Sequence, residues 1–180
     1  RKLRIGTLFG DTPESSDNAL RDLGTQQSKH IDLLHCATPK CLGKMQWRLS
    51  DMKQGIERVC CSQCNSTVGS DEIFLTREAQ QRTLPDILFT TTEMLNQQLV
   101  NPKYQPLFGI GQRVKKPTMV LMDEVHTYEG TTGAQTAYLL RRWLQMSQAK
   151  PHFVGLSATL SDASNFFANL IGAYKNQVVL

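Results

Sequence analysis

Residues 118–126 read Thr-Met-Val-Leu-Met-Asp-Glu-Val-His, an apolar run that ends in two acids. A short, continuous apolar run is typical of a strand that is buried on both faces of a parallel sheet. Asp123 and Glu124 follow this strand directly and therefore lie at its carboxyl end, where open α/β sheets bind their ligands. The stretch predicts an α/β fold with negative charge at one edge of the sheet.

The same kind of apolar run recurs along the chain. We expect further strands over residues 3–9, 86–90 and 153–156, and a fifth that begins at 178–180. Apolar spacing and capping residues predict helices over 93–100, 133–146 and 161–171, the last capped by Ser161-Asp162. Strands that alternate with helices imply right-handed crossovers and a parallel sheet flanked by helices.

The composition is that of an ordinary soluble globular chain. Its 180 residues are 40% hydrophobic and 20% charged, which allows one domain with a small insertion. The net charge of +4 permits nucleic-acid binding but does not argue for it. The longest aliphatic run, 119–122, is far shorter than the about 20 residues of a membrane span. Because the chain opens without an initiator methionine or a secretory segment, we expect a cytoplasmic piece of a longer polypeptide.

Two short-spaced pairs of cysteines, Cys36-x₄-Cys41 and Cys61-x₂-Cys64, suggest a metal site. Two such knuckles supply the four soft ligands of a tetrahedral zinc ion, and a disulfide framework is disfavoured without a secretory signal. Residues 24–72 also break the strand–helix alternation and hold few large apolar groups. We therefore predict an inserted, zinc-ribbon-like lobe in which zinc supplies what a core does not.

Other ligand sets for this site stay open. Cys60-x₃-Cys64 also fits a zinc knuckle, but the x₂ spacing is commoner, so Cys60 is interpreted as the spare cysteine. His30 and His35 lie close enough in the sequence to replace a cysteine, and we favour the four cysteines over either. The alternative to a metal site is a loop of reduced, unconnected cysteines.

Several motifs together resemble superfamily-2 helicases of the DExH type. Asp-Glu-Val-His at 123–126, followed one crossover later by Ser157-Ala158-Thr159, resembles their motifs II and III. Ile-Leu-Phe-Thr-Thr-Thr-Glu-Met-Leu at 87–95 resembles the segment with which they grip the nucleic-acid backbone. Gly-Asp-Thr-Pro at 10–13 resembles their Gly-Asp-Thr element. Order and spacing agree over nearly the whole chain outside the cysteine lobe.

A narrower resemblance concerns residues 123–142. The pattern Asp-Glu-Val-His-Thr-Tyr, then Gly130, Gly133-Ala134 and Leu-Leu-Arg-Arg at 139–142, is similar to the branch of the bacterial mitomycin-repair helicases. Large helicases of phage-defence systems such as DISARM and Druantia belong to the same branch. The resemblance implies an ATP-dependent DNA translocase or helicase, with single-stranded or duplex DNA, a second RecA-like lobe and repair or defence proteins as partners.

The resemblance also implies a role for each matched residue. Asp123 would position Mg²⁺ and Glu124 would activate the water that attacks ATP. His126 and Ser157-Ala158-Thr159, the coupling motif, would link the nucleotide state to the grip on DNA. The residues implied to contact the nucleic-acid backbone are Thr12, Thr90, Thr91, Thr92 and Glu93.

Simpler interpretations apply to the threonines and to the basic side chains that a nucleic acid could contact. A threonine before a helix often serves only as a cap, although three in a row exceed what a cap needs. Basic side chains on a helix usually form a solvated face, and this is what we expect of Arg77, Arg82, Arg141 and Arg142.

One part of the helicase pattern is missing: no Gly-x-x-x-x-Gly-Lys-Thr/Ser loop, which holds the phosphates of ATP, occurs in the 180 residues. In the family this loop precedes the Gly-Asp-Thr strand. We therefore interpret residues 1–23 and 73–180 as the C-terminal part of a first RecA-like lobe, interrupted by the cysteine lobe at 24–72. The chain alone is then expected to be inactive in ATP hydrolysis.

Two other functions remain as alternatives. One is a non-enzymatic zinc-ribbon binding module on a degenerate ATPase scaffold, which the intact acid pair disfavours. The other is a metal-dependent nuclease, which lacks support because no further carboxylate cluster is evident.

Overall fold

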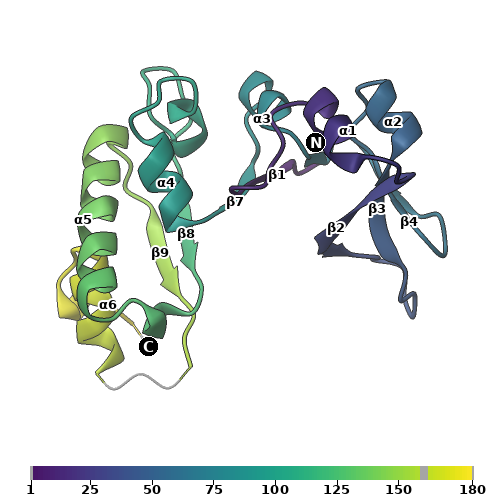
Figure 1. Ribbon diagram of the computed structural model, residues 1–180. Coiled ribbons are helices and arrows are strands. Elements are labelled where there is room, and N and C mark those ends of the chain that lie inside the picture. The colour runs from purple at the N-terminus through teal and green to yellow at the C-terminus, as the bar shows by residue number, and fades with distance from the viewer. Residues whose placement is uncertain (1, 159–161, 180) are drawn as a thin grey trace. The chain divides into compact units, whose positions relative to one another are not determined.

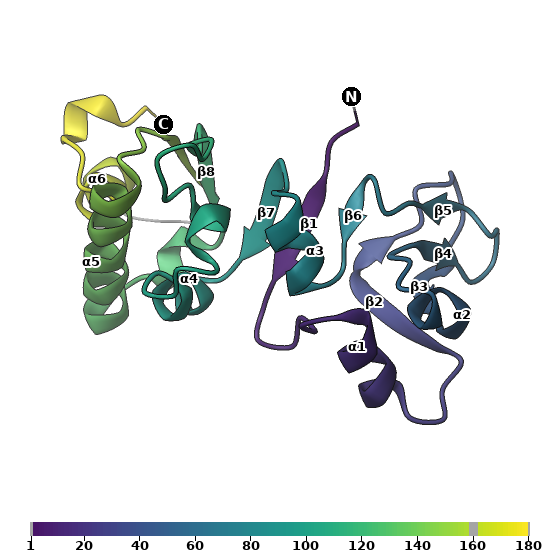
Figure 2. The same cartoon turned by 90° about the horizontal axis from the view of Figure 1, so that it is seen from above.

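Parallel strands form where the apolar runs predicted them. In the computed structural model, which describes residues 2–158 and 162–179, strand β1 (Ile5–Leu8) lies between β6 (Ile73–Phe74) and β7 (Ile87–Thr90), all parallel. Figure 2 shows these three strands side by side, with α3 beside them. Strand β8 (Met119–Met122) pairs in parallel with β9 (His152–Gly155). The described hydrogen bonds place the predicted strands in two parallel sheets.

Helices flank these strands, which confirms the α/β class. The three predicted helices form as α4 (Thr92–Gln98), α5 (Gly130–Ser147) and α6 (Ala163–Ile171). The short elements that were not predicted are α1 (Ser16–Leu23), α2 (Leu49–Lys53), α3 (Arg77–Arg82) and the 3₁₀ helices η1 (Gln105–Phe108), η2 (Val125–Thr127) and η3 (Lys175–Gln177). No helix within the described residues combines the length and apolarity that crossing a bilayer requires.

The predicted cap of α6 is only partly described. Ser161 lies outside the described residues, and Asp162 occupies the N-cap position without a capping hydrogen bond from its side chain. Its carboxylate instead pairs with Lys175 Nζ at 2.9 Å. Lys175 lowers the pKa of Asp162 through this contact.

The chain forms two compact units, Arg1–Met94 and Leu95–Leu180 (Figure 1). In the second unit, α5 packs against α6, where Arg141 donates to the Asn169 carbonyl at 2.9 Å. The buried Trp143 indole of α5 donates to the Phe108 carbonyl at 2.8 Å. These bonds tie α5 to α6 and to η1 within the second unit.

Two predictions about the strands are wrong. Ile87 and Phe89 of β7 and Met119 and Leu121 of β8 are exposed, so these strands are not buried on both faces. Successive side chains of a strand point to opposite faces, and in the described structure only one face of each of these strands is covered. The fifth strand does not form over residues 178–179, because no neighbouring strand pairs with them there and Val179 is 92% exposed. Leu180 lies outside the described residues.

The cysteine-rich segment folds as an antiparallel sheet in the order β2-β3-β4-β5. Its strands are β2 (Ser28–His35), β3 (Lys44–Arg48), β4 (Val59–Cys61) and β5 (Thr67–Val68). This part of the structure lies in the first unit, together with α1 and α2 (Figure 1).

This antiparallel sheet has a hydrophobic core, so the prediction that zinc replaces a core is wrong. Alternate residues of β3, Met45 and Trp47, point inward and are at most 3% exposed. The full set of buried core residues is Ala19, Leu23, Met45, Trp47, Met52, Val59, Cys61, Ile73 and Leu75. Because this set includes residues of α1 and β6, segment 24–72 packs on the residues that flank it on both sides.

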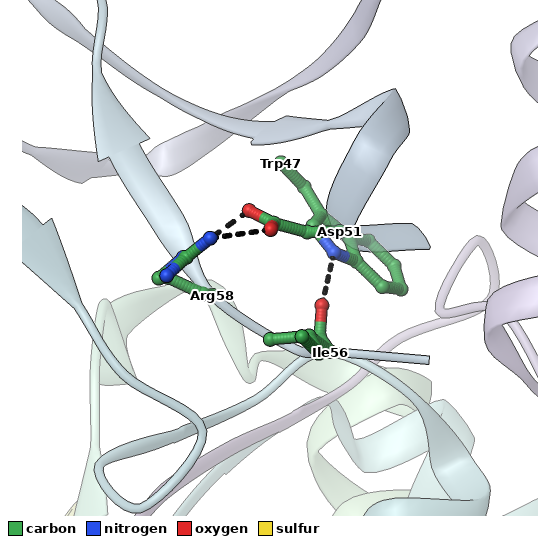
Figure 3. A network of polar contacts seen from close by, with 4 residues as sticks. All are labelled: Trp47, Asp51, Ile56 and Arg58. Carbon is green, nitrogen blue, oxygen red and sulfur yellow. Dashed lines mark hydrogen bonds and ion pairs between the residues drawn. The ribbon is translucent and has the colours of Figure 1, made fainter. Parts of the chain in front are cut away.

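Two polar contacts pair buried groups at and near Trp47 (Figure 3). The Trp47 indole Nε1–H donates to the Ile56 carbonyl at 2.8 Å. Nearby, Arg58 donates through Nη2 and Nε to the two carboxylate oxygens of Asp51, a residue that is only 2% exposed. These bonds satisfy polar groups that the core would otherwise bury without partners.

Candidate functional site

The two acids predicted from the sequence lie in a tight turn directly after β8. Glu124 has φ 49° and ψ 45°, in the left-handed region that residues other than glycine seldom adopt. Its amide donates to Asp123 Oδ1 at 2.9 Å, and both the amide and the hydroxyl of Thr127 donate to its carbonyl. The backbone of the turn is thereby fixed, while both carboxylates are exposed.

The segment that follows β9 is tied to this turn through the backbone. The Val125 amide donates to the Leu156 carbonyl at 2.9 Å, and the Leu156 amide donates to the Met122 carbonyl at 2.8 Å. The ends of β8 and β9 are therefore held together beyond their ladder. This places the predicted motifs II and III at one edge of the same sheet.

His126 connects the second acid with the first residue of the coupling motif. Its Nδ1 lies 3.3 Å from Glu124 Oε2 and 3.4 Å from Ser157 Oγ. Ala158 is exposed beside this contact, and Thr159 lies outside the described residues. The imidazole therefore lies between the two side chains, so that a movement of Ser157 would be transmitted through His126 to the Glu124 carboxylate.

The threonine cluster after β7 combines structural bonds with exposed groups. Thr90 Oγ1 donates to the backbone carbonyl of the last residue of β1 at 2.9 Å. Thr91 Oγ1 accepts from the Met94 amide at 3.1 Å, the bond of a helix-capping threonine. Thr91 and Glu93 are exposed and Thr92 is half-buried. Capping thus accounts for one of the three threonines.

Thr12 lies inside the turn between β1 and α1, residues 9–13. Its hydroxyl accepts from the Phe9 amide at 2.8 Å and donates to the Thr7 carbonyl at 3.2 Å, and the residue is 8% exposed. Since the hydroxyl accepts from Phe9 in the turn and donates to Thr7 in β1, Thr12 acts on the shape of the turn.

The four predicted metal ligands gather between two loops of the antiparallel sheet. All their sulfur atoms lie within 4.8 Å of one another, with Cys36–Cys64 at 3.4 Å and Cys41–Cys61 at 3.6 Å. Sulfurs around a tetrahedral zinc ion, bonded at about 2.3 Å, lie about 3.8 Å apart. The observed spacing therefore fits a Cys₄ zinc site without rearrangement of the backbone.

Hydrogen bonds favour the thiolate form at two of the four sulfurs. The Thr38 hydroxyl and the Ser66 amide lower the pKa of Cys64 to about 6. The amides of Cys64 and Gln63 lower the pKa of Cys61. A thiolate is the form that binds a metal, so these donors prepare the site for one.

Cys41 and Gly43 show how closely the site is packed. The Gly43 amide favours the Cys41 thiolate, but burial and the three neighbouring cysteines raise the pKa of Cys41 to about 12. A Cβ atom at Gly43 would lie 2.3 Å from Cys61 Sγ. Only glycine fits there, because any side chain would occupy the space of the sulfur.

The remaining cysteine stands apart from this group. Cys60 is 2% exposed, and it precedes Cys61 on β4, so its side chain points to the opposite face of the strand. Among the described residues, neither Cys60 nor His30 nor His35 belongs to the cluster of potential ligands.

Arg77 was expected on a solvated face, and this expectation is wrong. Its Nε donates to the Thr12 carbonyl at 2.8 Å, and its Nη2 donates to the carbonyls of Phe9 and Gly10, both at 3.1 Å. These partners are 65 to 68 positions away in the sequence, and no local pattern marks such a contact.

Glu57 is a second residue that sequence reasoning missed. It is 6% exposed, and its carboxylate accepts from the amides of Leu75 and Thr76 and from the Thr76 hydroxyl. Burial raises the pKa of Glu57, although these donors act in the opposite direction. A single glutamate next to Arg58 looks like a surface residue until the fold brings Leu75 and Thr76, which follow β6, beside it.

Comparison with known proteins places the chain in a family. A profile of the DEAD/DEAH box helicase family matches residues 44–166, more than half of the chain. A solved structure described as a crystal structure of DUF1998 helicase MrfA bound to DNA is similar at 20% identity and a TM-score of 0.46. That similarity covers 95% of this chain and 19% of the other. No curated protein gives a significant match. On the strength of the family match, which includes the acid turn and the threonine cluster, the chain belongs to the DEAD/DEAH box helicases.

Proposed function

We propose that this chain is part of the motor of an ATP-dependent nucleic-acid helicase or translocase. The observation that carries the proposal is the Asp123–Glu124 turn, with two exposed acids at the carboxyl edge of a parallel pair. Its backbone adopts a conformation that costs energy at Glu124, and such strain tends to be kept where a side chain must point in one direction.

The side chains divide the work of hydrolysis. Glu124 accepts the proton of the attacking water, and His126, whose Nδ1 lies 3.3 Å away, orients its carboxylate. Asp123 would hold Mg²⁺ through oxygens of the kind that this ion prefers, and the bound ion neutralises charge on the phosphates of ATP. Ser157 follows β9 and lies 3.4 Å from the imidazole, so a movement of the chain at the end of β9 is transmitted to the Glu124 carboxylate through His126.

The exposed and half-buried groups at the start of α4 support a contact with single-stranded nucleic acid. The side chains of Thr91, Thr92 and Glu93 line the turn after β7, and hydroxyls at such a turn bind phosphate oxygens without reading bases. Thr90 and Thr12 hold the backbone of this region by their bonds to β1. DNA as the partner, and a role in repair or phage defence beside a second RecA-like lobe, are proposed from the resemblance of residues 123–142.

We also propose zinc for the four cysteines, within a lobe that spans residues 24–72. The close spacing of the four sulfurs and the lowered pKa of Cys64 and Cys61 support this choice. Zinc takes four thiolates readily, whereas Mg²⁺ and Ca²⁺ prefer oxygen ligands.

The test of the motor function is a Glu124→Gln variant of the intact protein, compared with Glu129→Gln. Glu129 is also exposed, lies five positions further on, and makes no capping bond with its side chain. The Glu124 variant should bind ATP and hydrolyse it slower by a factor on the order of 10² or more, whereas the Glu129 variant should match the parent. The 180-residue chain alone should show no turnover. Hydrolysis at the parent's rate by folded Glu124→Gln would refute the mechanism.

A further inference from the structure

We infer that Arg77 is the positioning residue of the turn at residues 9–13, and that Glu57 links this turn to the cysteine-containing lobe. The inference rests on the proposed function, because it takes this turn to lie at the nucleic-acid contact. All the residues that carry it belong to the first compact unit.

The side chain of Arg77 spans the turn from end to end. Its guanidinium donates to the carbonyls of Phe9 and Gly10 on one side and of Thr12 on the other. Its backbone amide donates to the Pro13 carbonyl at 3.0 Å. A guanidinium presents its donors in a rigid plane, and a lysine ammonium cannot reach three carbonyls in this arrangement. Arg77 therefore fixes the path of the turn through its geometry and not through its charge alone.

The turn has few other bonds that hold it. Within it, the Phe9 amide donates to Thr12 Oγ1 and the Thr12 amide donates to the Phe9 carbonyl at 3.2 Å. These two bonds close the turn, but they leave the Gly10 and Thr12 carbonyls to Arg77. Losing the guanidinium would leave these carbonyls to water and would loosen the segment.

Helix α3 holds Arg77 in place because it is fastened to β1. Gln80, fully buried, donates to the Thr7 carbonyl at 2.9 Å. This close approach requires glycine on the strand, since a Cβ atom at Gly6 would lie 2.7 Å from Gln80 Oε1. The Thr76 side chain caps the helix through the Ala79 amide. Arg77 therefore moves only if the start of α3 moves.

Glu57 fastens the start of α3 to the lobe. Its Oε2 accepts from the Leu75 and Thr76 amides, and its Oε1 accepts from the Thr76 hydroxyl at 2.5 Å. Glu57 immediately precedes Arg58, and the strand that follows, β4, ends at the metal-ligand candidate Cys61. Cys61 and Leu75 also share the lobe's hydrophobic core. A shift of the lobe therefore reaches the residue next to Arg77 by a buried carboxylate and by the core.

The experiment measures hydrogen exchange of the peptide that covers residues 9–14, in the intact protein, by mass spectrometry. Two variants are tested: Arg77→Lys, which keeps the charge, and Glu57→Ala, which changes no residue of the turn. The control is Arg21→Lys, the same substitution at an exposed arginine of α1. Losing charge-assisted bonds should speed exchange in the first two variants by about tenfold, with the control unchanged. Unchanged exchange in Arg77→Lys, or in Glu57→Ala, would overturn the inference.

A second readout separates this inference from the proposed function. Affinity for single-stranded DNA should fall by about tenfold in Arg77→Lys and stay unchanged in Arg21→Lys. Both substitutions keep the positive charge, but only Arg77→Lys changes the path of the turn at residues 9–13. If the parent binds DNA and Arg77→Lys binds it equally well, the inference is refuted while the motor function stands. If the parent does not bind nucleic acid at all, the proposed function fails, whereas the exchange result still decides whether Arg77 and Glu57 hold the turn.

Discussion

Removing a ligand from the cysteine site tests the zinc proposal most directly. Cys64 lies exposed at the edge of the cluster, so Cys64→Ser changes a ligand without changing the core. The matched control is Cys60→Ser, four positions earlier and outside the group of four. The purified parent and the control should each contain about one zinc per chain, and Cys64→Ser should contain almost none.

The structure also sets the size of the effect on stability. The sulfurs at 3.4 and 3.6 Å lie close to the about 3.8 Å of a zinc tetrahedron, so binding requires little rearrangement. Eight buried residues form a core together with Cys61, so the lobe should stay folded without metal, unlike a small zinc finger. Stabilisation then follows mass action, about 2.7 kcal/mol at a free zinc concentration of 100 times Kd. For a chain of this length that corresponds to about 5–10 °C in Tm.

The assay combines metal analysis with thermal unfolding in zinc and in chelator. The parent and Cys60→Ser should lose about 5–10 °C in chelator, whereas Cys64→Ser should melt at the lower temperature in both conditions. Full zinc content in Cys64→Ser would refute the ligand assignment. Complete unfolding of the parent in chelator at room temperature would refute the argument that the core suffices.

Two further predictions concern Glu57 and the threonine cluster. Because burial raises the pKa of Glu57, its contribution to stability is present below the usual glutamate pKa of about 4.3 and is lost as pH rises through the raised value. The denaturation midpoint of Glu57→Gln relative to the parent should therefore increase between about pH 4 and pH 7, and a flat difference would contradict this. In the intact protein, Thr91→Ala should cost about 1 kcal/mol of stability, because it removes the cap on the Met94 amide. Thr92→Ala removes no capping bond and should weaken single-strand binding without changing base preference, and unchanged affinity across a salt titration would count against the contact.

The parallel strands could be predicted because each is a short apolar run bounded by polar residues. The four runs confirmed as β1, β7, β8 and β9 needed no knowledge of their neighbours. Their burial could not be predicted in the same way, because it depends on what covers each face. The apolar Ile87 and Met119 are 42% and 61% exposed although their sequences suggest complete burial.

The antiparallel sheet was missed because its pattern is weak. Strand β3 alternates inward Met45 and Trp47 with polar neighbours over only five residues, and β5 has two residues. Its inward residues become a core only when residues outside the segment join them: Leu23 of α1, Ile73 of β6 and Leu75, which follows β6. When part of a segment's core comes from flanking residues, the sequence of the segment alone contains few apolar residues.

The candidate site shows the same division between local and distant information. The acids and the four cysteines were found because close spacing along the chain carries their chemistry. Arg77 and Glu57 were missed because their partners lie 65 and 18 positions away, at contacts that only the fold creates. Residues that hold a site in place are in general harder to recognise than residues that perform its chemistry, since any polar side chain can serve.

The position of the cysteine lobe in the fold bears on what it does. The chain leaves the parallel sheet after β1, forms α1 and the antiparallel sheet, and returns as β6, the direct neighbour of β1. A module that folds independently has a core of its own, yet this core takes Ala19 and Leu23 from before segment 24–72 and Leu75 from after it. Glu57 adds a buried carboxylate that satisfies backbone amides of the parallel part, and leaving these unpaired would cost about 1–3 kcal/mol each. The lobe is therefore structurally continuous with the sheet edge at which β1 ends, and we expect a change at its four-cysteine cluster to act on that edge.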